Sequence, residues 1–346
     1  MRAIDLFCGA GGLTVGLKQA GFDVVSAIEK EEIVAKTYNI NHPDVALYTG
    51  DIKLISPEGM MTALGLKPGE LELLAGCPPC QGFSTLRTRN KNASVEDVRN
   101  DLIFSFLEYV VMFLPKVVML ENVPALAKDY RINVFCDELK KLGYYVNEDS
   151  VAIEDASYFG VPQRRRRMVL LASRLGYLSR AEKNKTKITV RDAIGNLPLP
   201  HLSEDSLHNI KENRTEKVKN IISLVPKDGG SRSDLPYEYW LPCHKKYPGG
   251  FKDVYGRMKW DSVSPTITSG CTNPSKGRFL HPTQDRAITL REAALLQTFP
   301  SDYYFPVNHG KDRAALMIGN ALPPEFIKRH AEVIKKHLEI LGEQNG

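Results

Sequence analysis

The stretch Asp5–Leu17, "DLFCGAGGLTVGL", decides the fold class. A short apolar run ends at Phe7, glycines follow, and helical spacing starts near Leu13. Such a turn lets the backbone approach a ligand closely at the carboxyl edge of a sheet. The spacing is not the dinucleotide pattern G-x-G-x-x-G, and no Walker lysine follows, which disfavours a pyrophosphate ligand. Because Glu29 ends the next expected strand, where an acid can bind ribose hydroxyls, we expect a nucleoside-type cofactor.

Short apolar runs alternate with helical stretches through the first half of the chain. This alternation predicts an α/β fold with a mostly parallel sheet and helices on both faces. Asp101 is the expected N-cap of the third helix. The expected strands are Ala3–Cys8, Val24–Ile28, Ala46–Thr49, Leu71–Ala75, Val117–Leu120, Tyr144–Val151 and Arg167–Ala172. The expected helices are Leu13–Ala20, Glu31–Asn39, Leu102–Phe113 and Ile132–Leu142.

The character of the chain changes after about residue 175. Residues 176–285 are rich in Pro, Gly, Lys and Ser, with short strand-like pieces and no long periodic helix, which is typical of a loop-rich domain. They hold 18 Lys and Arg against 12 Asp and Glu, whereas the rest of the chain holds 28 against 29. A basic segment suits a polyanionic partner, but charge alone favours the simpler explanation of a solvated surface of mixed charge.

Helical spacing returns near the C-terminus. Ala287–Pro300 carries Thr289 as an N-cap with Glu292 as its capping-box partner, and Pro324–Leu341 is amphipathic. We therefore expect a catalytic and cofactor-binding domain at 1–175, a smaller domain at 176–285, and a segment at 286–346 that returns to the first domain.

Composition excludes several classes of protein. With 42% hydrophobic and 25% charged residues, the chain has the make-up of an ordinary globular protein. No run approaches the roughly 18 apolar residues of a membrane span, and the N-terminus lacks the apolar core of a signal peptide. Six cysteines in such a chain are expected to be reduced thiols of a cytoplasmic protein.

Two cysteines, Cys77 and Cys80, bracket two prolines in "GCPPCQGFS". A metal site, a redox pair and a nucleophile are the three candidate roles. Zinc needs about four ligands, and the sequence offers no second Cys-x-x-Cys pair. A nucleophile needs a nearby group that polarises its target. Glu121, after four apolar residues in "LENVPAL", ends an expected strand beside the one that leads to Cys80. A carboxyl group there is costly unless it is paired or functional.

The ordered set of motifs resembles the DNA (cytosine-5)-methyltransferase family of prokaryotic type. The motifs are "DLFCGAGG", "GDI", "GCPPCQGFS", "ENV", "QRRRR", "REAALLQTFP" and "GNALPP", from Asp5 to about Glu325. The resemblance implies a Rossmann-like, S-adenosylmethionine-dependent methyltransferase sheet with a smaller, loop-rich target-recognition domain at 176–285.

The resemblance also implies the catalytic residues. Cys80 is the nucleophile that adds to C6 of cytosine, and Glu121 hydrogen bonds or protonates N3. Arg167 is placed on the cytosine O2, and Arg165 near Cys80 and a phosphate. Cys77 occupies a position that the family fills variably, and we expect it only to pack.

For S-adenosylmethionine, the resemblance implies an apolar contact from Phe7, a ribose contact from Glu29 and an adenine contact from Asp51, although an Asp capping the next turn would look the same. One departure concerns Lys30, because some relatives place an aromatic residue there to stack on adenine. The cofactor residues are Phe7, Gly9, Ala10, Gly11, Gly12, Glu29, Asp51, Ile52, Pro79, Leu102 and Asn320.

A base inside a duplex must be flipped out to reach such a site. The segment Ser84–Asn100 is suited to close over DNA, and "PTIT" resembles the Thr-Ile element of the family near the target base. The expected DNA contacts are Ser84, Arg87, Arg89, Gln163, Arg257, Thr266, Thr268 and Arg278.

The expected partner is double-stranded DNA, for a monomeric, cytoplasmic and nucleoid-associated enzyme without a metal, with a cognate restriction endonuclease as a candidate partner. Two alternatives stay open. One is a tRNA cytosine-5 methyltransferase, which "CQGFS" in place of "CQPFT" and the long basic segment disfavour. The other is an inactive DNA-binding regulator, which the presence of Cys80, Glu121, Arg165 and Arg167 disfavours.

Overall fold

The computed structural model describes residues 1–79, 101–246, 248–250 and 252–342. The chain forms two compact units. The first, here called the sheet unit, comprises Met1–Phe159, Arg166–Lys183 and Leu322–Gly346. The second, the loop unit, comprises Gly160–Arg165 and Asn184–Ala321. No helix in the described ranges has the length and apolar character of a membrane span.

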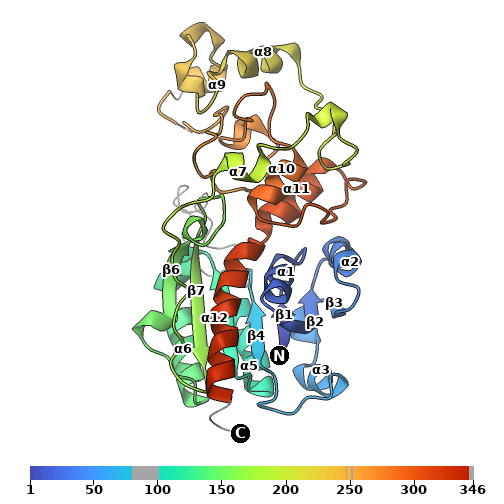
Figure 1. The fold of residues 1–346 in the computed structure, drawn as a ribbon, viewed down its shortest axis with the longest axis vertical. Coiled ribbons are helices and arrows are strands. Elements are labelled where there is room, and N and C mark those ends of the chain that lie inside the picture. The colour runs from blue at the N-terminus through green and yellow to red at the C-terminus, as the bar shows by residue number, and fades with distance from the viewer. Residues whose placement is uncertain (80–100, 247, 251, 343–346) are drawn as a thin grey trace. The chain divides into compact units, whose positions relative to one another are not determined.

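A sheet in the order β3-β2-β1-β4-β5-β7-β6 forms the centre of the sheet unit (Figure 1). The first five strands of this order run parallel, while β7 is antiparallel to both of its neighbours. The strands are β1 Arg2–Leu6, β2 Asp23–Glu29, β3 Ala46–Thr49, β4 Leu73–Gly76, β5 Val117–Asn122, β6 Val151–Asp155 and β7 Arg166–Ser173. The sheet is therefore mostly parallel, as the sequence predicts.

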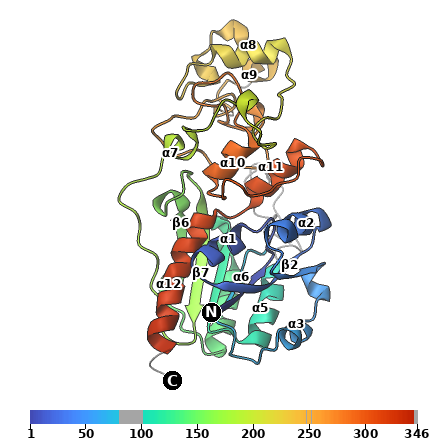
Figure 2. The ribbon, with the colours of Figure 1, turned by 45° about the vertical axis from the view of Figure 1, so that its right-hand side comes forward.

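Helices cover both faces of this sheet (Figures 1 and 2). The first and last helices, α1 and α12, lie side by side on one face, while α3, α5 and α6 lie on the other. A Cβ on Gly16 would stand 2.5 Å from the Pro324 oxygen, so only glycine permits this approach of α1 to α12. The helices of this unit are α1 Gly12–Gln19, α2 Glu32–Asn41, α3 Pro57–Ala63, α5 Leu102–Phe113, α6 Tyr130–Lys141 and α12 Pro324–Gly342.

Strand register brings four strand ends to one edge of the sheet. Leu6 at the end of β1 pairs with Ile28 of β2 on one side and with Gly76 of β4 on the other. Gly76 in turn pairs with Leu120 of β5. The residues that directly follow these partners therefore converge at the carboxyl edge, where open α/β sheets bind their ligands.

In its described residues, the loop unit contains only short helices, as expected for a loop-rich domain. These helices are α7 Val190–Ile194, α8 Glu216–Leu224, α9 Pro242–Lys246, α10 Leu290–Leu296 and α11 Lys311–Asn320. Isolated bridges such as Arg257 with Leu280 replace regular strands. A small core built around Ile222, Val225 and Leu280 supports α8. The predicted capping box of Thr289 and Glu292 is present at the start of α10.

One local prediction is wrong, and a second is confirmed only in its position. The strand expected at Tyr144–Val151 begins only at Val151, because a capping box between Asn147 and Ser150 turns the chain first. Asp101 stands at the N-cap of α5 but makes no capping hydrogen bond. Its carboxylate instead accepts from Arg131 Nε at 3.0 Å.

Candidate active site and cofactor cradle

The glycine turn after β1 forms the first wall of the site. Gly9 and Gly11 adopt φ angles of 55° and 96°, and Gly11 is the N-cap of α1. Phe7 also has a positive φ, 63°, which is rare for a side chain of this size and typical of functional turns. A Cβ on Gly9 would meet no atom within 4 Å, so the turn borders space that can hold a ligand.

Glu29 lies beside this turn, at the end of β2. Its carboxylate accepts from the backbone N–H of Gly9 at 3.0 Å and from that of Glu31 at 2.7 Å. Burial raises the pKa of Glu29, and these two hydrogen bonds oppose the rise. The side chain is therefore fixed against the turn with lone pairs left over for a ligand hydroxyl.

Asp51 follows β3, the neighbour of β2. Its carboxylate caps the turn at Lys53 N and forms an ion pair of 2.8 Å with Lys30. The hydrogen bond from Lys30 is the largest cause that lowers the pKa of Asp51. The lysine found where some relatives have an aromatic residue thus contacts the carboxylate expected to meet adenine, an interaction that sequence reasoning missed.

Apolar side chains complete the cradle. Ile52 is 4% exposed, and Phe7 and Leu102 are half-buried against the same core. Pro79 is exposed. An open glycine turn, a fixed carboxylate and an apolar wall on neighbouring strand ends fit a nucleoside with a charged tail. Ala10 and Gly12 complete the turn, while Asn320 is exposed and ends α11 in the loop unit.

Glu121 occupies the next strand end along the edge. It lies on β5 with a side chain only 1% exposed. One carboxylate oxygen accepts from Cys77 Sγ at 2.8 Å, and the other forms an ion pair of 2.9 Å with Arg167 Nε. Arg167 comes from β7, which runs antiparallel to β5 and starts where β5 ends. Such partners make a buried carboxylate tolerable.

The expectation that Cys77 only packs is wrong, because its thiol donates to Glu121. Asn122 of the "ENV" motif, for which the sequence indicates no role, fixes the backbone next to Cys77. Its Nδ2 donates to the Pro78 oxygen at 2.9 Å, and Cys77 N donates to the Leu6 oxygen at 3.2 Å. The chain that leads toward Cys80 is therefore held from both neighbouring strands.

Arg165 and Arg167 lie in different units, although two positions separate them. Arg165 is 2% exposed and donates to the oxygens of Ile267 and Gly319, both at 3.1 Å. Arg167, in contrast, forms its ion pair with Glu121 in the sheet unit. Cys80, Ser84, Arg87 and Arg89 lie outside the described residues. Among those that are described, no group of three His, Cys, Asp or Glu side chains could hold a metal ion.

The profile of the C-5 cytosine-specific DNA methylases matches residues 1–336. The chain belongs to this family. It is therefore a DNA (cytosine-5)-methyltransferase: DNA is its substrate, and S-adenosylmethionine is its methyl donor.

Curated relatives match the sequence of this methyltransferase over nearly its whole length. The Type II methylase M.HgiDII of Herpetosiphon aurantiacus is 37% identical and covers 99% of this chain and 97% of its own. The Type II methyltransferase M1.HphI of Haemophilus parahaemolyticus is 32% identical, covering 96% and 86%. Among solved structures, a provisionally assigned prophage-encoded DNA modification methyltransferase (E. coli) has a TM-score of 0.70 at 24% identity, over 98% and 99% of the chains. That likeness supports the fold.

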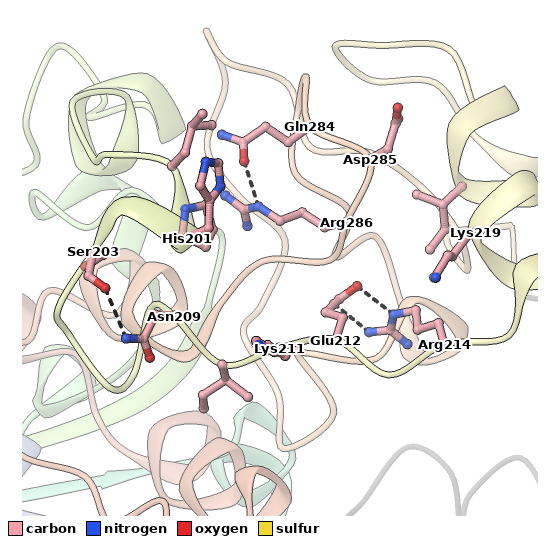
Figure 3. Close-up of a pocket in the computed structure, with 14 residues that line it drawn as sticks. His201, Ser203, Asn209, Lys211, Glu212, Arg214, Lys219, Gln284, Asp285 and Arg286 are labelled. Carbon is pink, nitrogen blue, oxygen red and sulfur yellow. Dashed lines mark hydrogen bonds and ion pairs between the residues drawn. The ribbon is translucent and has the colours of Figure 1, made fainter.

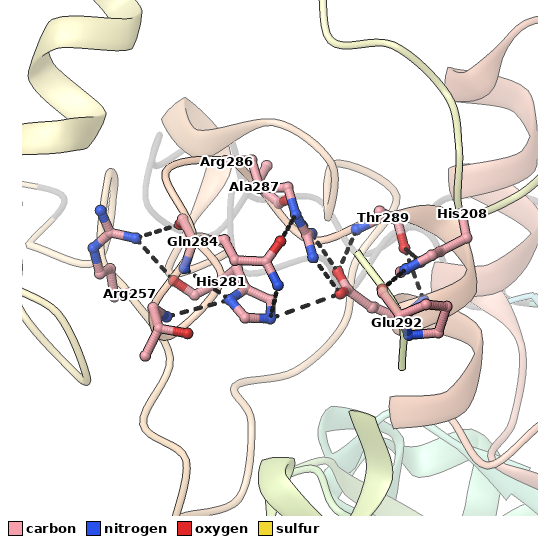
Figure 4. Close-up of polar contacts among 10 residues, drawn as sticks. His208, Arg257, His281, Gln284, Arg286, Ala287, Thr289 and Glu292 are labelled. Atoms are coloured by element: carbon pink, nitrogen blue, oxygen red, sulfur yellow. Dashed lines mark hydrogen bonds and ion pairs between the residues drawn. The ribbon is translucent and has the colours of Figure 1, made fainter. Parts of the chain in front are cut away.

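In the loop unit of this methyltransferase, two expected DNA contacts are buried. Arg257 is 0% exposed, and its five N–H groups are all used within the unit. They donate to Asp285 Oδ1 and to the backbone oxygens of Ile222, Val225, His281 and Gln284. Figure 4 shows the contacts of Arg257 with His281 and Gln284. This arrangement does not fit a DNA contact, because no donor is left for a base or a phosphate. Arg257 instead joins the chain segments of the unit.

Gln163 is likewise 0% exposed. Its side-chain oxygen accepts from Ile267 N at 2.9 Å, and its Nε2 donates to Gln297 Oε1 at 2.7 Å. The predicted DNA contact of Gln163 is therefore replaced by an internal role. Thr268 is exposed and Thr266 is half-buried, so both stay candidates for DNA contact. Arg278 is half-buried and donates to Gly229, Gly230 and Arg257 oxygens.

A pocket of about 630 Å³ opens in the loop unit (Figure 3). Its charged walls largely pair with one another or with nearby groups. Arg214 forms two hydrogen bonds with Glu212, and Arg286 forms two with Glu292. Lys219 pairs with Glu216. Because charges of both signs line the pocket and largely pair with one another, the pocket has no preference for an anionic or a cationic ligand. We therefore assign no ligand to it.

Proposed function

We propose that this methyltransferase flips one cytosine out of a specific duplex DNA sequence and methylates its C5 through a covalent intermediate on Cys80. The observation that carries the proposal is the buried Glu121 carboxylate. It contacts Cys77, which directly follows β4, and Arg167 on β7. Groups that act on N3 and O2 of a cytosine need to lie together beside the nucleophile.

In this mechanism the thiolate of Cys80 adds to C6, and the electron pair of the C5–C6 bond moves to C5. S-adenosylmethionine supplies the methyl group as an electrophile. Glu121 hydrogen bonds or protonates N3 as negative charge develops on the ring, and Arg167 donates to O2. Loss of the C5 proton then lets the thiolate leave and restores the double bond.

We propose that Phe7, the turn Gly9–Gly12, Glu29, Asp51 and Ile52 hold the cofactor, with Pro79 and Leu102 completing its site in the sheet unit. The glycine turn and Glu29 would hold the ribose and the methionine tail, while Asp51 and Ile52 would meet the adenine. Because Lys30 already contacts Asp51, we assign the adenine end to this pair in place of an aromatic stack.

We propose that residues 176–285 read the target sequence. Their excess of six positive charges suits phosphate contacts, which position a protein on DNA, while exposed side chains such as Thr268 suit base contacts. Ser84, Arg87 and Arg89 complete the proposed DNA-binding set. The protein would act as a monomer in the cytoplasm, on nucleoid DNA.

A restriction–modification role is also proposed, with a cognate endonuclease as partner. Relatives that are 37% and 32% identical to this chain are named Type II methylases or methyltransferases. A host methylation mark that protects one short sequence is the function this name describes.

Expression in a methylation-free host followed by bisulfite sequencing tests the proposal. We expect 5-methylcytosine at one short sequence, and its absence despite soluble, cofactor-binding protein would refute the activity. DNA with 5-fluorocytosine at that site should trap the wild-type protein covalently, because fluorine cannot leave C5 as a proton does. Cys80→Ser should abolish the adduct and nearly all turnover, since a hydroxyl is far less ionised than a thiol. An adduct that survives in Cys80→Ser would show that another group is the nucleophile.

A further inference from the structure

We propose that Cys77 is a positioning residue for Glu121, with its thiol holding the carboxylate in the orientation that the reaction uses. This inference rests on the proposed role of Glu121 at N3 of the target cytosine. It gives Cys77, the first cysteine of the Cys-x-x-Cys pair, a role other than metal binding or packing.

Strand register explains why the two side chains meet. Gly76 and Leu120 are partners on the parallel strands β4 and β5, so the residues that follow them, Cys77 and Glu121, occupy the next matched position. The thiol lies 2.8 Å from Glu121 Oε2. Because an ionised carboxylate can only accept, the thiol is the donor of this hydrogen bond.

The backbone of Cys77 is fixed from two sides, which makes the thiol a stationary donor. Cys77 N donates to the Leu6 oxygen of β1, and the Pro78 oxygen, one residue further on, accepts from Asn122 Nδ2. With its backbone anchored to both neighbouring strands, Cys77 has only the rotation about χ1 to restrict when its thiol holds the carboxylate.

Cys77 and Arg167 contact different oxygens of the same carboxylate. Arg167 Nε lies 2.9 Å from Oε1, and Cys77 Sγ contacts Oε2. A carboxylate with one anchored oxygen can still rotate about its last bond, whereas contacts on both oxygens fix its plane. Loss of the thiol therefore frees Glu121 to turn away from N3, at a cost in the chemical step and not in DNA affinity.

The experiment compares Cys77→Ala, which removes the donor, with Cys77→Ser, which keeps one. The matched control is Cys136→Ala, because Cys136 on α6 is also a half-buried thiol beside the sheet core but is not in contact with Glu121. Single-turnover methylation, KM for DNA, affinity for S-adenosylhomocysteine and thermal unfolding are measured for each variant, with the adduct on 5-fluorocytosine DNA.

We expect Cys77→Ala to methylate at least tenfold more slowly, a loss of about 1.4 kcal/mol in the chemical step, with KM and cofactor affinity unchanged. Cys77→Ser should recover most of this loss, and Cys136→Ala should match wild type in rate. In a Glu121→Gln background, Cys77→Ala should cause little further loss, because the carboxylate it orients is gone.

An unchanged rate in Cys77→Ala would overturn the inference. A Cys77→Ser variant that methylates as slowly as Cys77→Ala would also overturn it. So would a loss of rate from Cys77→Ala that is equally large in the wild-type and the Glu121→Gln backgrounds. A wild-type protein that forms no adduct with 5-fluorocytosine DNA would instead refute the proposed function, so the two failures can be told apart.

Discussion

The buried Asp5 carboxyl group on β1 makes the stability of this methyltransferase depend on pH. Asp5 is 0% exposed and accepts from the Thr14 hydroxyl at 2.7 Å. Burial raises its pKa from 3.8 to about 7, against the lowering effect of the Thr14 hydrogen bonds. Asp5→Asn keeps the size and the acceptor for Thr14 but removes the ionisation.

The sign of the effect follows from linkage. A carboxyl whose pKa is higher in the folded state favours folding below its unfolded pKa, and this contribution is lost as pH rises toward the folded value. A shift of about 3 units corresponds to about 4 kcal/mol in total. Between about pH 5 and pH 7, the free energy of unfolding of the wild type should fall by about 2 kcal/mol because of this group. Asp5→Asn should lack that loss.

Urea unfolding followed by far-UV circular dichroism at pH 5, 6 and 7 measures this difference. Both tryptophans, Trp240 and Trp260, lie in the loop unit, so their fluorescence reports that unit and serves as an internal comparison. Asp23→Asn, at an exposed position of β2, controls for loss of a carboxylate as such. Parallel pH profiles for wild type and Asp5→Asn would refute the reasoning.

Four further predictions concern the cofactor, DNA and acid stability. Calorimetry should show S-adenosylhomocysteine binding much more weakly to Glu29→Ala than to wild type, and binding of NADH by wild type would contradict the cradle. Lys30→Met should weaken the same binding by less than about fivefold, since exposed ion pairs contribute roughly 1 kcal/mol or less, and the difference should vanish in high salt. Replacing 176–285 with the segment of a relative of other specificity should transfer the methylated sequence, while DNA affinity falls steeply with salt; an active chimera with the original specificity would refute this. Burial would raise the pKa of Glu154, but its contacts with His330 and Arg180 lower it to about 2. Its contribution of about 3 kcal/mol should therefore be lost as pH falls from about 5 toward 2. Glu154→Gln should be less stable than wild type at pH 6, and the difference should shrink by about half or more at pH 3; a difference that does not shrink would contradict this.

The sequence predicts the sheet well where strands are continuous apolar runs. The segments Ala46–Thr49 and Leu102–Phe113 form a strand and a helix with the predicted bounds. The failure at Tyr144–Val151 has a specific cause, since Asn147 and Ser150 satisfy one another's backbone in a turn that apolar spacing does not reveal. Helix α3 was not predicted, although Ser56 and Pro57 are typical of a helix start.

Within the site, the sequence locates strand ends but not the partners that meet there. Glu121 could be assigned to the sheet edge because it ends an apolar run. Its contact with Cys77 depends on the register between β4 and β5, which one sequence does not contain. In the same way, Arg257 looks like other arginines of a basic segment, and only the fold shows that its donors bind five acceptors within the unit.

The arginine run of "QRRRR" shows where pattern reasoning ends. Alternation along a strand would place Arg165 and Arg167 on one face with a shared task. However, β7 begins only at Arg166, so Arg165 precedes the strand and is held by carbonyl groups of the loop unit, while Arg167 is held by Glu121. A motif of alternate arginines therefore anchors the chain in both units where it passes from one to the other. Substitutions at the two positions should be interpreted separately, since each changes a different unit.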